Sequence, residues 1–331
     1  MNDAITRLPG SDFDQRWKDV AHRWARHADH VRLAQVREEE TVQIGRGNCE
    51  WQSVWAYGLD TLLTHAACSV AVSARVVPHP DWIAILAPTH VTSVLRINGC
   101  EVGPEDIYLS TTANGHCITG QRRSGFALGL RRARLAGACA ALAGIAEDDL
   151  VIRDLEMSLG RDGAAHLHAL FWAAISEGWY ALSSVWEKAI LAHMARLLSP
   201  VLSTRSANRF PGLNALRAVR AAEAACADLA HPPTLPELCA AAGVGERWLR
   251  KCFIDVHGTP PAQYFLKRRL SAAHDRFLDP GARKHSVKDV ALSLGFFESG
   301  RFAQYYRDLF CEYPLDTLAR AENDPSTLVS R

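Results

Sequence analysis

The sequence of 331 residues lacks a long hydrophobic run, a C-x-x-C pair and a strong excess of either charge. Its longest mildly apolar stretches, 62–77 and 133–145, are short or are interrupted by His65 and Arg75, so neither is expected to span a membrane. The first residues contain no apolar segment of the kind found in secretory signals. The nine cysteines have no paired spacing, which indicates reduced thiols in the cytoplasm rather than disulfides or a zinc site.

The overall charge is +1, so bulk charge neither favours nor excludes nucleic acid as a partner, and any basic surface must be local. Hydrophobic residues make up 48% of the chain and charged residues 22%, as in globular proteins that bury a core. The length allows two ordinary domains. The character of the sequence changes along the chain, which indicates where these domains lie.

Short β-rich runs separated by turn residues occupy about 40–135 and predict an all-β barrel or sandwich. An exposed amphipathic segment is expected at 12–37, and apolar residues at three- and four-residue spacing predict helices from Glu147 onward. A stretch rich in Ser, Thr, Asn and Pro, from Pro200 to Pro211, predicts a linker. The expected fold class is α+β, divided into an N-terminal domain at 1–199, a linker at 200–210, an all-α domain at 211–320 and a tail at 321–331.

A helix-turn-helix pattern occurs twice in the C-terminal region. In each copy a hydroxyl is followed three residues later by a carboxylate, which is typical of a capping box at a helix start. Each copy then has a small residue where two helices cross, a glycine suited to positive φ, and two apolar residues four apart on the next helix. The matched positions are Thr234 with Ser286, Glu237 with Asp289, Cys239 with Ala291, Gly243 with Gly295, Leu249 with Phe302, and Phe253 with Tyr306.

The second helix of each copy has one face that is left free when its apolar residues dock inward. Such a face can present Arg and Gln side chains to base edges in a DNA major groove. An ordinary helical hairpin with a solvated charged face imitates a single copy easily, but two aligned copies favour a tandem DNA-reading unit. The candidate DNA-binding residues are Arg247, Arg250 and Lys251 in the first copy and Ser299, Gly300, Arg301 and Gln304 in the second.

Residues 211–320 resemble the AraC/XylS family of transcription regulators, through the motifs ELCAAAGV, KRRLSAA, VALSLGF and YYRDLF. The resemblance implies seven helices, with recognition helices at 246–253 and 299–309 joined by a long helix at 261–278. It also implies a small, cupin-like β-barrel sensor and dimerisation helices in the N-terminal half. The ending PLDTLA is similar to the subgroup of ethanolamine-operon regulators.

The function implied by this resemblance is that of a cytoplasmic, sequence-specific and ligand-responsive transcription activator. Its implied partners are double-stranded promoter DNA, a small-molecule effector, RNA polymerase and a second copy of the chain. No cofactor, catalytic residue, metal or membrane is expected. Trp51, Trp55 and Trp82 could line an apolar effector pocket or simply belong to the core.

Three residues depart from the pattern of that family. Gly245 stands where an N-cap serine is usual, which should weaken that cap by about a few tenths of a kcal/mol. Cys311 replaces a glycine, and because a positive φ would be strained for a cysteine, the local turn is expected to differ. Gly300 offers no side chain to a base, which puts one usual contact in question.

Two other classes stay open on the sequence alone. One is a β-barrel metalloenzyme, which would need imidazole or carboxylate ligands. The histidines of the β-rich region that could serve are His65, His79, His90 and His116. None forms an H-x-H arrangement on a strand, and the His166-x-His168 pair falls in an expected helix, where side chains two apart diverge. The other class is a co-regulator whose helical domain no longer reads DNA.

Overall fold

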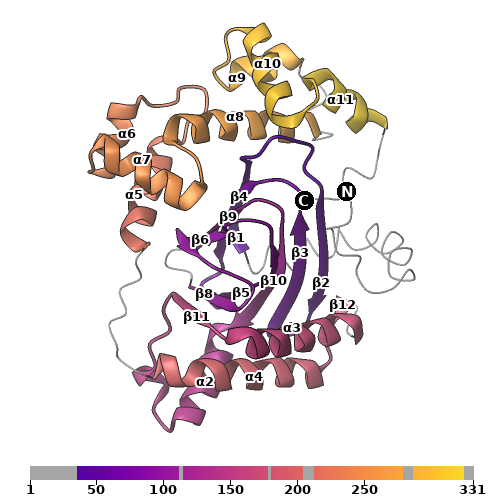
Figure 1. The fold of residues 1–331 in the computed structure, drawn as a ribbon, viewed down its shortest axis with the longest axis vertical. Coiled ribbons are helices and arrows are strands. Elements are labelled where there is room, and N and C mark those ends of the chain that lie inside the picture. Colours follow the sequence, from indigo (N-terminus) through magenta and orange to yellow (C-terminus); the bar gives the residue numbers. More distant parts are fainter. Residues whose placement is uncertain (1–35, 112–114, 178–179, 204–211, 279–285, 324–331) are drawn as a thin grey trace.

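The computed structural model describes residues 36–111, 115–177, 180–203, 212–278 and 286–323, and the structural statements below concern these residues. Nearly all of the amphipathic segment expected at 12–37 falls outside them. No described helix is long and apolar enough to cross a membrane. The described chain has a β-rich N-terminal part and a helical C-terminal part (Figure 1), so the α+β prediction is confirmed.

Two largely antiparallel sheets form the β-rich part. The first sheet has the strand order β1 (Val36–Gln43), β4 (Val72–Pro78), β9 (His116–Gly120), β6 (Arg96–Ile97) and β7 (Cys100–Glu101). The second has the order β11 (Leu155–Ser158), β8 (Asp106–Ser110), β5 (Trp82–Val91), β10 (Arg123–Arg131), β3 (Thr61–Cys68), β2 (Trp51–Tyr57) and β12 (Tyr180–Ala181).

No strand pairing within the described residues joins the two sheets, so the small closed barrel expected from the sequence is corrected to two separate sheets. One edge strand of each sheet explains this difference. Strands β7 and β12 have two residues each, which is too few to carry a hydrogen-bond ladder around the gap between the sheets.

Three helices cover the second sheet: α2 (Arg132–Ala143), α3 (Gly160–Glu177) and α4 (Ser184–Leu202) (Figure 1). Their apolar side chains share one core with the sheet, in which Leu128 of β10 lies with Phe171 of α3 and Leu198 of α4. Helix α4 continues through Pro200 in its last turn, where the missing N–H of proline disturbs only the end of the helix, so it reaches into the expected linker. Residues 204–211 lie outside the described residues.

Two elements of this region differ from the sequence-based expectation. Helix α2 starts well before Glu147, where the sequence predicted the first helix. It was not predicted because its run of Ala, Leu and Gly has no polar face that local spacing could reveal. After a short 3-10 turn at Glu147–Asp149, residues Leu155–Ser158 form β11 instead of a helix. They do so because they pair with β8, and this long-range partner is invisible in the local pattern.

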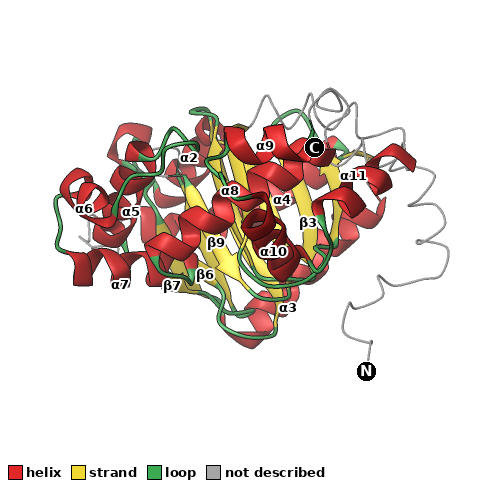
Figure 2. Ribbon diagram, turned by 90° about the horizontal axis from the view of Figure 1, so that it is seen from above, coloured by secondary structure: helices red, strands yellow, loops and turns green. Residues whose placement is uncertain are grey.

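The described parts of 212–323 contain seven helices, the number that the family resemblance implies. They are α5 (Leu213–Ala225), α6 (Leu235–Ala242), α7 (Glu246–His257), α8 (Pro261–Leu278), α9 (Val287–Ser293), α10 (Ser299–Phe310) and α11 (Pro314–Asn323). Figure 2 shows α5–α7 and α10–α11 lying apart, with α8 between them. Helix α8 has the bounds expected for the connecting helix, since Pro261 suits a first helical turn.

The first sheet and the helical domain share a core. Val42 of β1 and Cys117 of β9 belong to the same buried cluster as Val219 of α5, Phe253 of α7 and Phe265 of α8. A second, separate cluster holds α8 to α9 and α10. The helical domain is therefore packed against the first sheet through its first helix-turn-helix unit and α8.

Candidate nucleic-acid interface and the adjoining cavity

The first helix-turn-helix unit consists of α6 and α7. The Glu237 carboxylate accepts a hydrogen bond of 2.7 Å from the backbone N–H of Thr234, which closes the predicted capping box. Gly243 ends α6 with φ of 63°, a conformation that favours glycine. Leu249 and Phe253 of α7 are fully buried, as the sequence predicts. These contacts fix the orientation of α7 and leave its other face outside the core.

The exposed face of α7 carries all three candidate residues of the first unit, Arg247, Arg250 and Lys251. The Arg250 guanidinium donates to the Glu246 carboxylate at 2.8 Å. The Lys251 ammonium donates to Asp255 at 2.5 Å. Both are exposed pairs within one helix, which contribute little to stability and are easily exchanged for another anion. The side chains are thus available to bases and phosphates.

The second unit consists of α9 and α10. The Asp289 carboxylate accepts from the N–H of Ser286 at 3.1 Å, so the second capping box is also present. Gly295 has φ of 76°, and a Cβ there would lie 2.3 Å from the Ala230 carbonyl oxygen, so only glycine fits this turn. Phe302 and Tyr306 dock α10 into the core. The turn and the docking residues match the sequence prediction.

The exposed face of α10 carries Ser299, Gly300, Arg301 and Gln304. Arg301 donates from Nε to the hydroxyl of Tyr305 at 2.9 Å. A Cβ at Gly300 would meet nothing within 4 Å, so this position is open space and not a packing requirement. The structure brings the candidate residues of each unit onto one exposed helix face.

The departures from the family pattern have visible structural effects. Gly245 occupies the N-cap of α7 without a side-chain cap, as expected. Cys311 ends α10 with φ of 61°, so the cysteine adopts the positive φ despite its strain, and the expectation that this strain would change the turn is wrong.

Both recognition helices have their C-terminal ends held by the first sheet or by the residues that follow β1. The side-chain amide of Gln43 donates to the Leu309 carbonyl oxygen of α10 at 3.2 Å, and the N–H of Gly47 donates to the same oxygen at 2.9 Å. The backbone N–H of Gln43 donates to Ser271 of α8 at 3.0 Å. An ion pair between Glu40 and Arg268 lies beside these bonds.

A buried polar group of five side chains connects the end of α7 to the first sheet; we call it the interdomain network. It comprises Ser73, Cys117, Glu223, His257 and Tyr264. His257 Nδ1 lies 2.7 Å from the Ser73 hydroxyl and 3.5 Å from the Cys117 sulfur. Its Nε2 lies 3.1 Å from Glu223 Oε1, an ion-pair distance without hydrogen-bond alignment. Tyr264 donates to Glu223 at 2.8 Å.

The interdomain network shifts the pKa values of its members. Burial disfavours the charge on His257, but Cys117 and Glu223 outweigh it and raise the pKa to about 9. Burial likewise opposes the charge on Glu223, yet the hydrogen bonds and charge of its neighbours lower its pKa to about 2. The pKa of Cys117 is lowered, with burial opposed by His257. A charged histidine is therefore held between the two domains at neutral pH.

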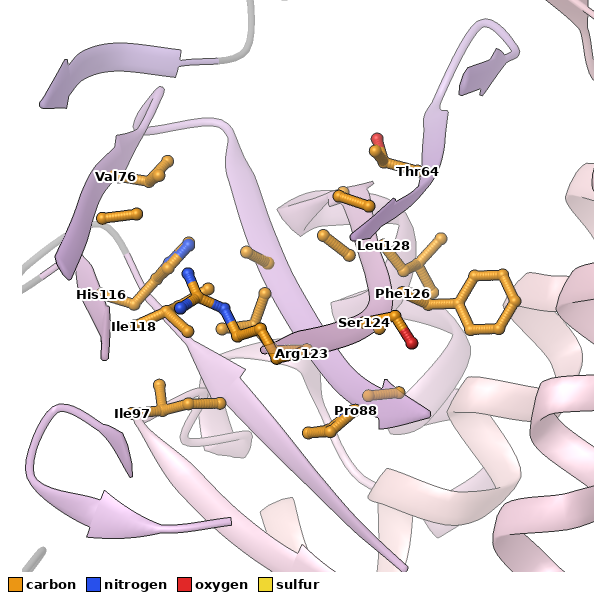
Figure 3. Close-up of a pocket in the computed structure, with 18 of the residues that line it drawn as sticks. Thr64, Val76, Pro88, Ile97, His116, Ile118, Arg123, Ser124, Phe126 and Leu128 are labelled. Atoms are coloured by element: carbon orange, nitrogen blue, oxygen red, sulfur yellow. The ribbon is translucent and has the colours of Figure 1, made fainter. Parts of the chain in front are cut away.

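A cavity of about 200 Å³ lies between the two sheets (Figure 3). Its wall is mostly apolar and includes Trp51, Trp55 and Trp82, so the three tryptophans do line a pocket. Two basic side chains, those of His116 and Arg123, reach into this space in Figure 3.

The two basic groups in the cavity differ in charge. Burial and the charge of Arg220 lower the pKa of His116 to about 4, so this imidazole is neutral at neutral pH. Arg123 donates to the backbone carbonyls of Val72 and Gly120, each at 3.2 Å. Among the described residues no carboxylate forms an ion pair with it. A cation in an apolar cavity without a carboxylate partner is costly, and an anionic ligand group would offset that cost.

The first sheet lies between this cavity and the helical domain. Side chains alternate along its strands, so neighbouring residues face opposite sides. On β9, His116 and Ile118 line the cavity, whereas Cys117 contacts His257. On β4, Ala74 lines the cavity, whereas Ser73 bonds to His257.

The candidate metal ligands do not come together. His65 is buried against Trp172 and bonds to Thr89, and burial lowers its pKa to about 4. His166 packs against the ring of His193, tilted by 38°, instead of sharing a site with His168. Across the described chain, no group of three potential metal-ligating side chains is found.

Sequence reasoning missed the partners of the recognition helices on the first sheet. Neither His257 nor Glu223 has its partner nearby in the sequence. Their contact is therefore visible only once the packing of two distant segments is known. Arg123 was missed for the same reason, although an arginine at the start of an otherwise apolar strand was a possible signal.

The arrangement defines a tandem helix-turn-helix domain of the kind that binds DNA. A family model for helix-turn-helix domains matches residues 238–320. The XylDLEGF operon transcriptional activator 1 of Pseudomonas putida is 41% identical over 87 residues, which cover 26% of this chain and 26% of the relative. The C-terminal domain belongs to the AraC/XylS family. The match spans only about a quarter of the length of that relative.

Solved structures include similar domains. A probable AraC family transcriptional regulator from Rhodopseudomonas palustris CGA009 is 39% identical and covers 31% of this chain and 96% of its own, with a TM-score of 0.29. ToxT from Vibrio cholerae O395 is 10% identical and covers 87% of this chain and all of its own, with a TM-score of 0.30.

Proposed function

We propose that the chain is a sequence-specific DNA-binding transcription regulator whose activity responds to a small molecule. The observation that carries this proposal is the pair of helix-turn-helix units, each with a docked apolar face and an exposed face, which carries Arg and Lys in the first unit and Arg and Gln in the second. Bidentate contacts of Arg to guanine and of Gln to adenine suit such faces. In this reading Arg247, Arg250 and Lys251 serve one half of the DNA site, and Ser299, Arg301 and Gln304 serve the other.

The cavity between the sheets is the proposed effector site. Its volume of about 200 Å³ exceeds the roughly 150 Å³ that holds one aromatic ring in an engineered apolar cavity. The wall is largely apolar, and Arg123 is the charged donor that a ligand would meet inside it. We infer a compact apolar ligand with one anionic group, such as a small carboxylic acid.

The route from effector to DNA runs through the first sheet. Because alternate residues of β4 and β9 face the cavity and the interdomain network, a ligand that shifts these strands also shifts the contacts of His257. That side chain lies at the end of the first recognition helix. No longer chain of contacts is needed to couple the two sites.

The remaining features follow from the family. The curated relatives carry the name of activators, which supports activation over repression, and an activator works together with RNA polymerase. One chain can read both halves of a DNA site. A second copy of the chain, held through the N-terminal helices, would bind a second such site beside the first. Such a regulator acts in the cytoplasm, where the promoter DNA lies. A co-regulator without DNA binding is the alternative that the next experiment tests.

The test is selection of DNA from a random library by the full-length protein, followed by affinity measurements on the selected site. We expect a two-part site whose halves are about one helical turn, roughly 34 Å, apart. A panel of small carboxylic acids is then screened by thermal shift, since a ligand at 100 times its dissociation constant adds about 2.7 kcal/mol of stability.

The control for the effector is Arg123→Met, which should abolish the shift by acids while DNA binding without ligand persists. Failure to enrich any sequence would contradict the DNA-reading function. Acids that stabilise the chain and Arg123→Met equally would contradict the effector site alone.

A further inference from the structure

Two of the nine cysteines lie in contact at the end of the second sheet. The sulfur atoms of Cys49 and Cys68 are 3.6 Å apart. Cys68 is the last residue of β3, whereas Cys49 lies in the connection between β1 and β2. The backbones beside them are tied together, since the N–H of Ser69 donates to the Glu50 carbonyl oxygen at 3.0 Å.

Cys68 has the surroundings of a reactive thiol. It lies directly opposite Arg123 in the pairing of β3 with β10. Facing side chains in such a pair have Cβ atoms about 4.5–5.5 Å apart. The hydrogen bond from Cys49 and the positive charge of Arg123 lower the pKa of Cys68 to about 7, against the effect of burial. The pKa of Cys49 is raised by its bond to Cys68 and by burial.

The two sulfurs differ in their access to solutes. Cys68 is a buried residue that lines the cavity, so a small molecule in the cavity lies beside it. Cys49 is half-buried. No other two cysteines of the described chain are in such contact; Cys117, whose pKa is also lowered, has hydroxyls and His257 as its neighbours. Cys117 therefore lacks a second thiol with which to form a bond.

We propose that Cys49 and Cys68 form a dithiol site that hydroperoxides convert into a disulfide. The Cys68 thiolate attacks one peroxide oxygen, the O–O bond breaks, and the departing oxygen takes up a proton, which leaves a sulfenic acid on Cys68. The Cys49 sulfur then attacks the Cys68 sulfur, the S–O bond breaks, and hydroxide leaves with the Cys49 proton as water. The two thiols supply the two electrons that reduce the peroxide.

The geometry suits this reaction. The sulfurs must approach from 3.6 Å to about 2.05 Å. Cys68 is fixed between two paired strands, so the movement falls on Cys49, which lies outside the strands and can follow. Disulfides that form in reducing compartments are usually transient and either catalytic or redox-sensing.

The experiment uses the full-length protein, reduced and then freed of reductant, with hydrogen peroxide as the probe. Intact mass and peptide mapping should show the loss of two hydrogen atoms, one link between Cys49 and Cys68, and reversal by dithiothreitol. Cys49→Ser should stop at the Cys68 sulfenic acid, which a dimedone-type reagent traps. Cys68→Ser should consume peroxide roughly tenfold more slowly or worse, because the thiolate is lost. Circular dichroism checks that each variant is folded.

Two controls separate this site from general thiol chemistry. Cys252→Ser removes another buried cysteine and should react like the unaltered chain. Arg123→Gln should move the pH dependence of the reaction to higher pH, and Arg123→Lys should restore much of it, because the positive charge supports the Cys68 thiolate. A disulfide between other cysteines, a rate unaffected by Cys68→Ser, or oxidation of Cys68 beyond the sulfenic acid with Cys49 unchanged would overturn the proposal.

Discussion

His257 holds a charge in the interior between two domains, where desolvation normally removes it. The charge persists because Glu223 and Cys117 compensate it, and Tyr264 holds Glu223 in place. Removing one partner of a buried pair costs about 3–5 kcal/mol, since the other is left uncompensated. The network is therefore a single unit whose members cannot be exchanged one at a time.

The first prediction is the pH dependence of this unit. The pKa of His257 is raised from 6.5 to about 9, so its stabilisation is complete below pH 6.5 and is lost as pH rises toward 9. The pKa of Glu223 is lowered from 4.5 to about 2, so its stabilisation is present above pH 4.5 and is lost as pH falls toward 2. Urea unfolding at a series of pH values measures both.

Glu223→Gln should lower the free energy of unfolding by about 3–5 kcal/mol near pH 6 and flatten its decline between pH 6.5 and 9. Tyr264→Phe, the matched control, removes only a hydroxyl and should cost about 1 kcal/mol. An unchanged decline in Glu223→Gln would show that other groups cause it.

The second prediction concerns the strained end of α10. Cys311 has φ of 61°, which costs a residue with a Cβ about 1–2 kcal/mol. Cys311→Gly should therefore be about 1 kcal/mol more stable than Cys311→Ala, which keeps the strain but also lacks the thiol. Thermal unfolding of the two variants gives this difference; equal stability would mean that the turn relaxes around alanine.

At the scale of elements, the recognition helices could be predicted closely from the sequence. Each helix-turn-helix unit is specified by local chemistry within one short segment: a capping box at the start of the first helix, a glycine at the turn and an apolar pair on the recognition helix. Helix α2 and strand β11 could not be predicted in this way. The first has no polar face to give a period, and the second exists because of β8, which lies far away in the sequence.

The third prediction concerns the DNA-reading face of these helices. Arg250→Ala and Arg301→Ala should each cost about 1–3 kcal/mol of DNA affinity at one base position and relax the preference there. A lysine that contacts only phosphate should behave differently, so Lys251→Ala should weaken all sequences alike and flatten the salt dependence. Binding to a library of singly substituted sites distinguishes the two patterns, with Arg161→Ala, an exposed change in the N-terminal domain, as the neutral control.

Uniform loss of affinity in both arginine variants, with base preferences intact, would mean that the helices contact only the DNA backbone.

At the scale of the whole molecule, the sequence suggests two modules joined by a linker, and the structure adds a shared core. Val42 and Cys117 of the first sheet pack among the helices of the C-terminal domain. Composition and linker chemistry cannot reveal this contact, because it joins segments more than a hundred residues apart. The cavity was likewise only hinted at by its tryptophans.

The fourth prediction follows from the shared core. A fragment of residues 208–331 should fold as a helical monomer and bind DNA, but its first helix-turn-helix unit should exchange amide hydrogens faster than in the full chain, since it loses the cover of β1 and β9. Helix α9, which packs in the other cluster, should be little affected and serves as the internal control. An unfolded fragment, or equal exchange in α7, would contradict this division.

The alternation of side chains on β4 and β9 has a consequence for engineering. Residues that face the cavity and residues that face His257 occupy the same strands but never the same positions. A sensor with a new ligand preference could therefore be built by altering Ala74, Val76, His116 and Ile118 alone. A hybrid that joins this DNA-binding domain to a foreign sensor would instead have to carry over Ser73 and Cys117. Chimeras that keep these two residues should change their DNA binding when the ligand binds. Chimeras that keep only the cavity should bind their ligand without a change in DNA binding.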